Sequence, residues 1–341
     1  MTELKLNLAD NSYNITVGEG ILNSADKYFN LNRKVFIITD NGVPEEYAEA
    51  IKKQCKNAMI FTVESGESAK SLTVLETVYN AMMEFGMGRK DCAVAVGGGV
   101  VGDLTGFAAA TYMRGIDFYN VPTTMLAQVD SSIGGKTAVN LGNVKNIVGA
   151  FHQPKGVLID IDVLKTLPRR HFSAGLAEAI KMSLTSDKEL FDFFDKETLN
   201  EKNIETVIVK ALMIKKAVVE ADEKEAGLRK ILNFGHTFGH GIEANKLGEL
   251  YHGECVALGM LPMCSPEIKD RLISVLKKFG LPTEFSGNVE KAISFVEHDK
   301  KASNGNISAI FVNEIGKFEI KELSFPEFAN HIRNAYTATR G

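Results

Sequence analysis

The sequence lacks three features that would each point to a class of protein: a basic excess, a long apolar run and paired cysteines. Its 341 residues carry 39 lysines and arginines against 43 aspartates and glutamates, so the net charge is −4. This balance argues against a nucleic-acid-binding protein, which normally carries a basic excess. A small anionic substrate is compatible with it, because a local cluster of basic residues does not need a basic total.

No apolar run approaches the ~20 residues that span a bilayer. The longest candidate, 92–113, is interrupted by Asp103 and is rich in glycine. The first residues, MTELKLN, do not have the layout of a signal peptide. The four cysteines show no C-x-x-C spacing, so we expect reduced thiols and a cytoplasmic location.

At about 150 residues per domain, the length predicts two domains. In the first half, apolar β-rich runs alternate with helical patterns, which is typical of a parallel sheet covered on both faces. We expect strands at 34–39, 58–63, 92–96, 118–121 and 157–161, helices at 44–55 and 72–85, and an N-terminal hairpin of 4–8 with 13–17.

From about residue 169 the apolar residues recur at intervals of three and four, which indicates helices. We expect helices at 174–185, 204–220, 228–247, 253–263 and 272–279, and one hairpin of 307–312 with 317–320. The predicted fold is therefore an α/β, Rossmann-like domain with a parallel sheet at 1–168, followed by a mainly α-helical domain at 169–341.

A glycine-rich segment, GGGVVGD at 97–103, directly follows a predicted strand. Glycines allow the backbone to approach a ligand, and the helix that follows offers free N–H groups to a phosphate. The spacing differs from the G-x-G-x-x-G dinucleotide motif, and a plain strand-to-helix turn is the alternative. We favour anion binding, because a plain turn rarely needs so many glycines.

Two further segments of the first half have a functional and a structural interpretation. Asp40 ends a predicted strand, where an acid can bind ribose hydroxyls or cap a helix. The segment DSSIGGKT at 130–137 ends like a P-loop, but Asp130 stands where a P-loop has glycine, so we exclude a P-loop NTPase. The segment is either a surface turn or a loop that orients an anionic substrate.

Histidines cluster in the second half. His236 and His240 are four residues apart in NFGHTFGH, so on a helix they share one face, and His252 follows. With Glu178 on an earlier helix, they could supply a zinc site that keeps an open position. From the pattern alone, His236 and His240 are the favoured ligand pair and the third ligand stays open. The alternative is that these histidines are structural.

Basic residues also occur near this part of the chain, at Lys181, Lys215, Lys216, Arg229 and Lys230. Such residues are usually a solvated helix face. The functional alternative is a pocket for phosphate and carboxylate groups.

Taken together and in this order, these segments resemble the 3-dehydroquinate synthase family of sugar-phosphate cyclases. The resemblance covers about residues 40 to 301. It is carried by 97–107 (GGGVVGDLTGF), 112–115 (YMRG), 121–124 (VPTT), 128–137 (QVDSSIGGKT), 145–146 (KN), 166–168 (TLP), 175–178 (GLAE), 222–225 (DEKE), 227–229 (GLR), 233–237 (NFGHT) and 252–254 (HGE).

The resemblance implies a set of site residues and two cofactors, NAD and a divalent metal ion, zinc or cobalt. The implied metal ligands are Glu178, His236 and His252, which replaces the pair favoured from the pattern, because His240 is implied to face the substrate phosphate. The implied NAD-binding residues are Asp40, Glu67, Lys70, Gly99, Asp103, Thr123, Thr124, Lys136, Lys145 and Thr166. The implied substrate-binding and catalytic residues are Arg114, Asp130, Lys136, Asn146, Lys181, Lys215, Arg229, Asn233, His240 and one lysine of the pair Lys300 and Lys301, with Lys300 favoured.

The implied activity is the conversion of 3-deoxy-D-arabino-heptulosonate 7-phosphate to 3-dehydroquinate and phosphate in the shikimate pathway. It would proceed by transient oxidation with NAD, phosphate elimination, reduction, ring opening and aldol cyclisation. Arg114 is implied to act across the interface of a homodimer. The alternatives are another cyclase (2-deoxy-scyllo-inosose synthase or an epi-valiolone synthase), an iron-type alcohol or glycerol-phosphate dehydrogenase, and a non-catalytic regulatory protein that binds NAD and metal. Arg114, Asn146 and His240 favour dehydroquinate synthase over the other cyclases.

Overall fold

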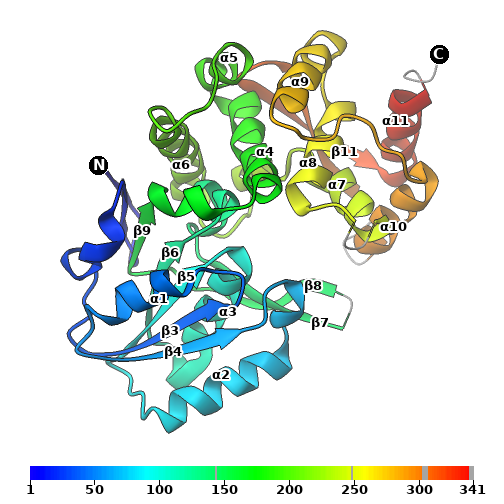
Figure 1. The fold of residues 1–341 in the computed structure, drawn as a ribbon. Coiled ribbons are helices and arrows are strands. Elements are labelled where there is room, and N and C mark those ends of the chain that lie inside the picture. Colours follow the sequence, from blue (N-terminus) through cyan, green and yellow to red (C-terminus); the bar gives the residue numbers. More distant parts are fainter. Residues whose placement is uncertain (143, 247–248, 302–305, 338–341) are drawn as a thin grey trace. The chain divides into compact units, whose positions relative to one another are not determined.

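The computed structural model describes residues 1–142, 144–246, 249–301 and 306–337 (Figure 1), and for 298–301 and 337 it describes the backbone alone. The chain forms two compact units, Met1–Pro168 and Arg169–Gly341. Each unit buries its own apolar residues. Among the described residues, no helix combines the length and the apolar character needed to cross a bilayer.

The first unit is built on a seven-stranded sheet in the order β1-β2-β9-β6-β5-β3-β4. The pair β1–β2 is an antiparallel hairpin, and the other neighbours in the sheet run parallel. Its strands are β1 (Thr2–Leu6), β2 (Tyr13–Gly18), β3 (Lys34–Asp40), β4 (Asn57–Val63), β5 (Cys92–Gly97), β6 (Asp117–Pro122) and β9 (Gly156–Asp160). The predicted strands and N-terminal hairpin are therefore confirmed.

Both faces of this sheet are covered, as the continuous apolar strands predict. Side chains alternate between the two faces along a strand. Phe36 of β3 packs in a cluster with residues of α2 and α3, whereas its neighbour Val35 packs in a second cluster with residues of η1 and α1. These helices are η1 (Ile21–Lys27, a 3-10 helix), α1 (Glu45–Lys52), α2 (Leu72–Glu84) and α3 (Gly99–Thr111).

The order of the strands reverses between β3 and β5. The chain leaves β3 through α1 on one face and leaves β5 through α3 on the other. In open α/β sheets, ligands bind outside the carboxyl ends of the strands at such a reversal. Asp40 ends β3 and Gly97 ends β5, so both lie at this point.

The β7–β8 hairpin and the short helices of the first unit were not predicted. β7 (Lys136–Leu141) and β8 (Val144–Phe151) form this antiparallel hairpin. β7 packs on α3, while residues of β8 such as Ile147 are mostly exposed. The short helices are η2 (Glu67–Ala69), η3 (Tyr112–Arg114), the π-helix η4 (Ala127–Ser131) and η5 (Ile161–Thr166).

The second unit is mainly helical, as predicted. Its elements are α4 (Arg169–Ser186), α5 (Lys188–Lys196), α6 (Ile204–Ala221), η6 (Leu228–Asn233), α7 (His236–Asn245), α8 (His252–Met260), η7 (Leu261–Met263), α9 (Pro266–Lys278), α10 (Val289–Lys301), the hairpin of β10 (Asn306–Glu314) with β11 (Lys317–Ser324), and α11 (Phe325–Thr337). The helices α5, α10 and α11 were not predicted, whereas the late hairpin was.

The helix predicted at 228–247 was wrong in its middle, because the structure divides it into η6 and α7. Gly235 between them has a φ of 76°, which is the left-handed region. A Cβ at this position would lie 2.6 Å from Cγ of Met260, so α8 also requires glycine there. The predicted helix at 272–279 begins earlier, at Pro266, because proline is tolerated in the first turn of a helix.

Candidate functional site

The glycine-rich turn joins β5 to α3 at the carboxyl end of the sheet. A Cβ on Gly99 would lie 3.0 Å from Oγ of Ser131, and a Cβ on Gly98 would lie 3.0 Å from Cγ2 of Thr124. In the described structure, no side chain caps the first amides of α3. Amides at the start of a 13-residue helix are suited to binding a phosphate group. The backbone of the turn therefore lies so close to the side chains of Ser131 and Thr124 that a side chain at either glycine would crowd them.

Lys70 gathers several predicted site residues around one ammonium group. Its side chain is buried, and Nζ lies 2.7 Å from Oδ2 of Asp103 and 2.5 Å from Oδ1 of Asn146. The carboxylate of Glu67 lies 3.8 Å away and accepts a hydrogen bond from Nδ2 of Asn140. The structure thus brings Glu67, Lys70 and Asp103 together. It also places Asn146, which was predicted to bind substrate, in this cluster.

The remaining strand ends carry polar side chains. Asp40 is the last residue of β3, and its Oδ1 accepts a hydrogen bond from the amide of Gly42. Asp40 therefore also stabilises the turn that follows the strand. Thr123 follows β6 and donates its amide to the carbonyl of Gly97, which ties the strand end to the glycine-rich turn. The hydroxyl of Thr166, after β9, lies 2.8 Å from that of Tyr47.

Other predicted residues of this unit lie on irregular backbone. Asp130 is half-buried in the π-helix η4, an element frequent at functional sites. Thr124 accepts a hydrogen bond from the first amide of η4 through Oγ1. Lys136 is the first residue of β7 and Lys145 is the second residue of β8. Both are exposed, as is Arg114, which has a φ of 69°.

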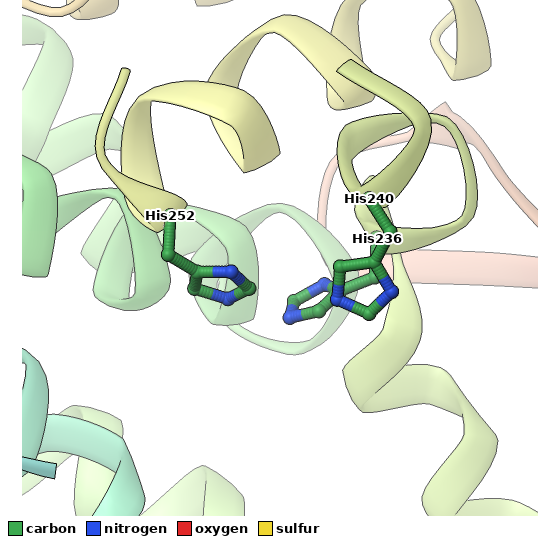
Figure 2. A group of neighbouring side chains, drawn as sticks. All are labelled: His236, His240 and His252. Carbon is green, nitrogen blue, oxygen red and sulfur yellow. The ribbon is translucent and has the colours of Figure 1, made fainter. Parts of the chain in front are cut away.

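In the second unit, three helices bring histidine and glutamate side chains together. Figure 2 shows His236 and His240 from α7 and His252 from α8 with their rings turned toward one another, and one ligand atom of each lies within 4.8 Å of the others. Nε2 of His236 and Nε2 of His252 lie 3.8 Å and 3.7 Å from Oε1 of Glu178 on α4. Glu178 is buried, with only 1% of its side chain exposed. Oxygen and nitrogen atoms in this arrangement are the ligand types of a zinc site.

The imidazoles of His236 and His252 are also held on Nδ1, the nitrogen that faces away from Glu178. Nδ1 of His236 lies 3.1 Å from the carbonyl of Phe234, and Nδ1 of His252 lies 3.2 Å from Oε2 of Glu243. Acceptors at Nδ1 favour the tautomer whose Nε2 carries a lone pair, as metal binding requires.

The surroundings of the cluster shift the pKa values of His236 and His252 in opposite directions. Burial and the positive charge of Lys181 hold the pKa of His236 well below its usual value, which keeps this ring neutral. Burial also lowers the pKa of His252, but the hydrogen bond to Glu243 and the charge of Glu178 outweigh it and raise this pKa overall. His252 therefore stands in the more negative surroundings, which a divalent cation would neutralise.

A buried cation, Lys181, contacts the cluster. The ammonium group of Lys181 contacts Oε2 of Glu178 and donates to the carbonyl of Leu232 at 2.6 Å. Lys215 on α6 and Arg229 on η6 are also buried. Such buried charges are rare outside functional or paired settings.

Asn233 and Arg229 are ordered by the loop that precedes them. Nδ2 of Asn233 donates to Oε1 of Glu225 at 3.0 Å, and Oδ2 of Asp222 accepts from the amide of Arg229 at 2.9 Å. The predicted Lys300 belongs to α10, but its side chain lies outside the described residues.

Glu243 and Asn140 are partners of site residues that were not predicted. Glu243 stands seven residues after His236 on α7, so the helical spacing of one face could have identified it. No comparable signal marks Asn140, whose contacts depend on the unpredicted β7–β8 hairpin.

The fold resembles that of several enzymes of known structure, two of which contain NAD+ and a metal ion. A 2-deoxy-scyllo-inosose synthase in complex with carbaglucose-6-phosphate, NAD+ and Co2+ superposes with a TM-score of 0.88 at 28% identity, over 98% of this chain and 99% of that one. ValA, a 2-epi-5-epi-valiolone synthase from Streptomyces hygroscopicus with NAD+ and Zn2+ bound, gives 0.87 at 27% identity over the same shares of the two chains. A probable glycerol dehydrogenase from Sinorhizobium meliloti, at 16% identity and a TM-score of 0.66 over 96% and 97% of the chains, shares the fold alone.

The sequence defines the family more narrowly. Residues 60–174 match the family model for the N-terminal domain of 3-dehydroquinate synthase. Residues 175–302 match the model for its C-terminal domain. The 3-dehydroquinate synthase of Prochlorococcus marinus (strain MIT 9515) is 41% identical over 92% of this chain and 94% of that protein. That of Streptococcus thermophilus (strain CNRZ 1066) is 40% identical over 97% and 99%. The chain belongs to the 3-dehydroquinate synthase family, which confirms the predicted family and fold.

Proposed function

We propose that this chain converts 3-deoxy-D-arabino-heptulosonate 7-phosphate to 3-dehydroquinate and phosphate, as a carbon–oxygen lyase of the shikimate pathway. Membership of the family supports the reaction. The observation that carries the proposal is the convergence of Glu178, His236 and His252, which come from three helices.

The proposed metal ligands fit a divalent ion. Oε1 of Glu178 is buried without a hydrogen-bond donor among the described residues and faces Nε2 of both His236 and His252. One carboxylate oxygen and two neutral imidazoles suit Zn²⁺ or Co²⁺ and leave positions open for substrate. The ion would supply Lewis-acid polarisation of substrate hydroxyl groups. The ammonium group of Lys181, which contacts Oε2 of Glu178, would offset part of the carboxylate's charge.

The first unit is proposed to bind NAD at the sheet reversal. NAD would supply the acceptor for a hydride that is later returned to the substrate. Asp40 would accept hydrogen bonds from ribose hydroxyls, and the amides of α3 from Gly99 onward would bind the diphosphate. The other residues proposed to line this site are Glu67, Lys70, Asp103, Thr123, Thr124, Lys136, Lys145 and Thr166.

We assign the remaining site residues to chemical groups of the substrate according to their charge. Lys136, Asn146 and His240 would bind the phosphate, and Arg229 with Lys215 and Asn233 would bind the carboxylate and hydroxyls. Asp130 and Lys181 would orient hydroxyl groups of the substrate. The contribution of these residues is orientation and charge placement. Lys300 is proposed for the same substrate on the family resemblance alone.

We also propose a homodimer in which Arg114 acts on the neighbouring subunit. Arg114 is exposed and held at a positive φ, and its neighbour Met113 is 44% exposed. This backbone strain presents a cation and an apolar side chain outward, which a partner subunit would cover. A cytoplasmic location stays a prediction; the four cysteines are free thiols.

Phosphate release from the heptulosonate phosphate tests the proposed function. We expect release that requires NAD, stops after chelator treatment and returns on addition of zinc or cobalt. Net accumulation of NADH would instead support a dehydrogenase. Phosphate release that persists without any metal would contradict the assignment of Glu178, His236 and His252.

A further inference from the structure

Glu243 is a charged side chain beside the histidine cluster with no part in the proposed chemistry. It lies on α7 at the seventh position after His236, on the helical face that also carries His240. Oε2 of Glu243 lies 3.2 Å from Nδ1 of His252. The side chains of Glu243 and His252 are 18% and 32% exposed, so solvent only partly screens the pair.

The ring of His252 therefore lies between two carboxylates. Nδ1 faces Glu243, and Nε2 lies 3.7 Å from Oε1 of Glu178. A neutral imidazole carries its proton on one nitrogen and a lone pair on the other. Since a carboxylate can only accept at Nδ1, Glu243 selects the tautomer with the lone pair on Nε2. His236 is held in the same way by a backbone carbonyl, so of these two acceptors Glu243 is the one that a substitution can remove.

α7 and α8 also pack through close contacts elsewhere along the two helices. A Cβ on Gly259 would lie 2.0 Å from the carbonyl oxygen of Gly235, and a Cβ on Gly239 would lie 3.0 Å from that of Cys255. The two helices thus approach through their backbones at glycine positions. Removal of the Glu243 carboxylate should leave them in place.

We propose that Glu243 is a positioning residue of the metal site, which accepts a hydrogen bond from Nδ1 of His252 and so orients Nε2 toward a divalent cation. This inference rests on the metal site of the proposed function. Partners of this kind raise the basicity of the ligating imidazole, and their loss typically weakens metal affinity about 10–100-fold.

The test measures zinc affinity of the metal-free, full-length chain by competition with a chromogenic chelator, together with the absorption spectrum of the cobalt form. For Glu243→Ala we expect zinc affinity about 10–100-fold weaker than that of the unmodified chain. Glu243→Gln keeps an acceptor but loses the charge, so we expect a smaller loss. The matched control is Glu249→Gln, since this carboxylate is 66% exposed and pairs with Lys246. We expect no change there.

Two further measurements separate positioning from folding. The melting temperature of the metal-free chain should be equal in the unmodified protein and in Glu243→Gln. Nitrogen-15 shifts of His252 should move from a single tautomer toward a mixture in the variants. Unchanged zinc affinity in a folded Glu243→Ala chain would overturn the inference, and if that variant does not fold, unchanged affinity in Glu243→Gln would do so. An unmodified chain that binds no zinc would instead overturn the metal site itself.

Discussion

The two units carry candidate sites of opposite construction. In the first unit, backbone amides at a glycine turn and polar side chains at strand ends form the site, and several of its residues, such as Lys136 and Lys145, are exposed. In the second unit the site consists of buried charged side chains on helices, among them Glu178 and Lys181. A buried charge depends on its partner far more than an exposed one. Single substitutions should therefore have larger effects in the second unit than in the first.

Glu178→Ala should have the largest effect. It removes a proposed metal ligand and leaves the ammonium group of Lys181, 2% exposed, without this partner. Loss of one member of a buried ion pair costs about 3–5 kcal/mol. We expect a free energy of unfolding lower by about this amount, measured with denaturant, and loss of bound zinc measured by elemental analysis. Unchanged stability would remove the basis of the comparison.

Lys70→Met tests the corresponding cation of the first unit. Lys70 is buried, but its partner Asp103 is 22% exposed and can be rehydrated. We therefore expect a loss of about 1–3 kcal/mol of stability and NAD affinity weaker by about ten-fold, or 1.4 kcal/mol. Calorimetric titration with NAD measures the second effect. A loss of stability larger than that of Glu178→Ala would show that single substitutions have the larger effect in the first unit, contrary to our expectation.

Gly99→Ala should act on ligand binding with little effect on folding. The new Cβ would approach Oγ of Ser131 to 3.0 Å and shift the start of α3. We expect NAD affinity weaker by about three- to ten-fold, or about 0.7–1.4 kcal/mol. Ser131→Ala in the same chain removes the crowding atom and should restore most of the affinity. Failure of this second change to restore binding would show that the crowding is not the cause.

The smallest effect should come from a peripheral charge of the second unit. Hydrogen bonds from Lys188 and Arg271 lower the pKa of Asp192 from 3.8 to about 2. A carboxylate with a lowered pKa stabilises the fold above its unfolded pKa, and this contribution is lost as the pH falls from about 4 to about 2. Solvent screening limits it to about 1 kcal/mol. Denaturant unfolding across this pH range should show a shallower decline for Asp192→Asn than for the unmodified chain.

The sequence was most informative where structure depends on local pattern. Continuous apolar runs predicted the strands from β3 to β9 except β7 and β8, because a strand covered on both faces is apolar throughout. The β7–β8 hairpin was missed because β8 is mostly exposed, so its residues carry no pattern of burial. The break at Gly235 was missed because a left-handed glycine and the close approach of α8 are not visible in helical spacing.

The sequence by itself determined the alternation of strands and helices, the glycine turn and the family, because these depend on neighbouring residues or on order along the chain. The tertiary structure alone decided which side chains meet. Helical spacing pairs His236 with His240, whereas folding also brings His252 and Glu178 beside His236. It also places Glu243 behind His252. These contacts join residues of separate helices, and their distances are set by how closely the helix backbones pack, which no spacing along one helix encodes.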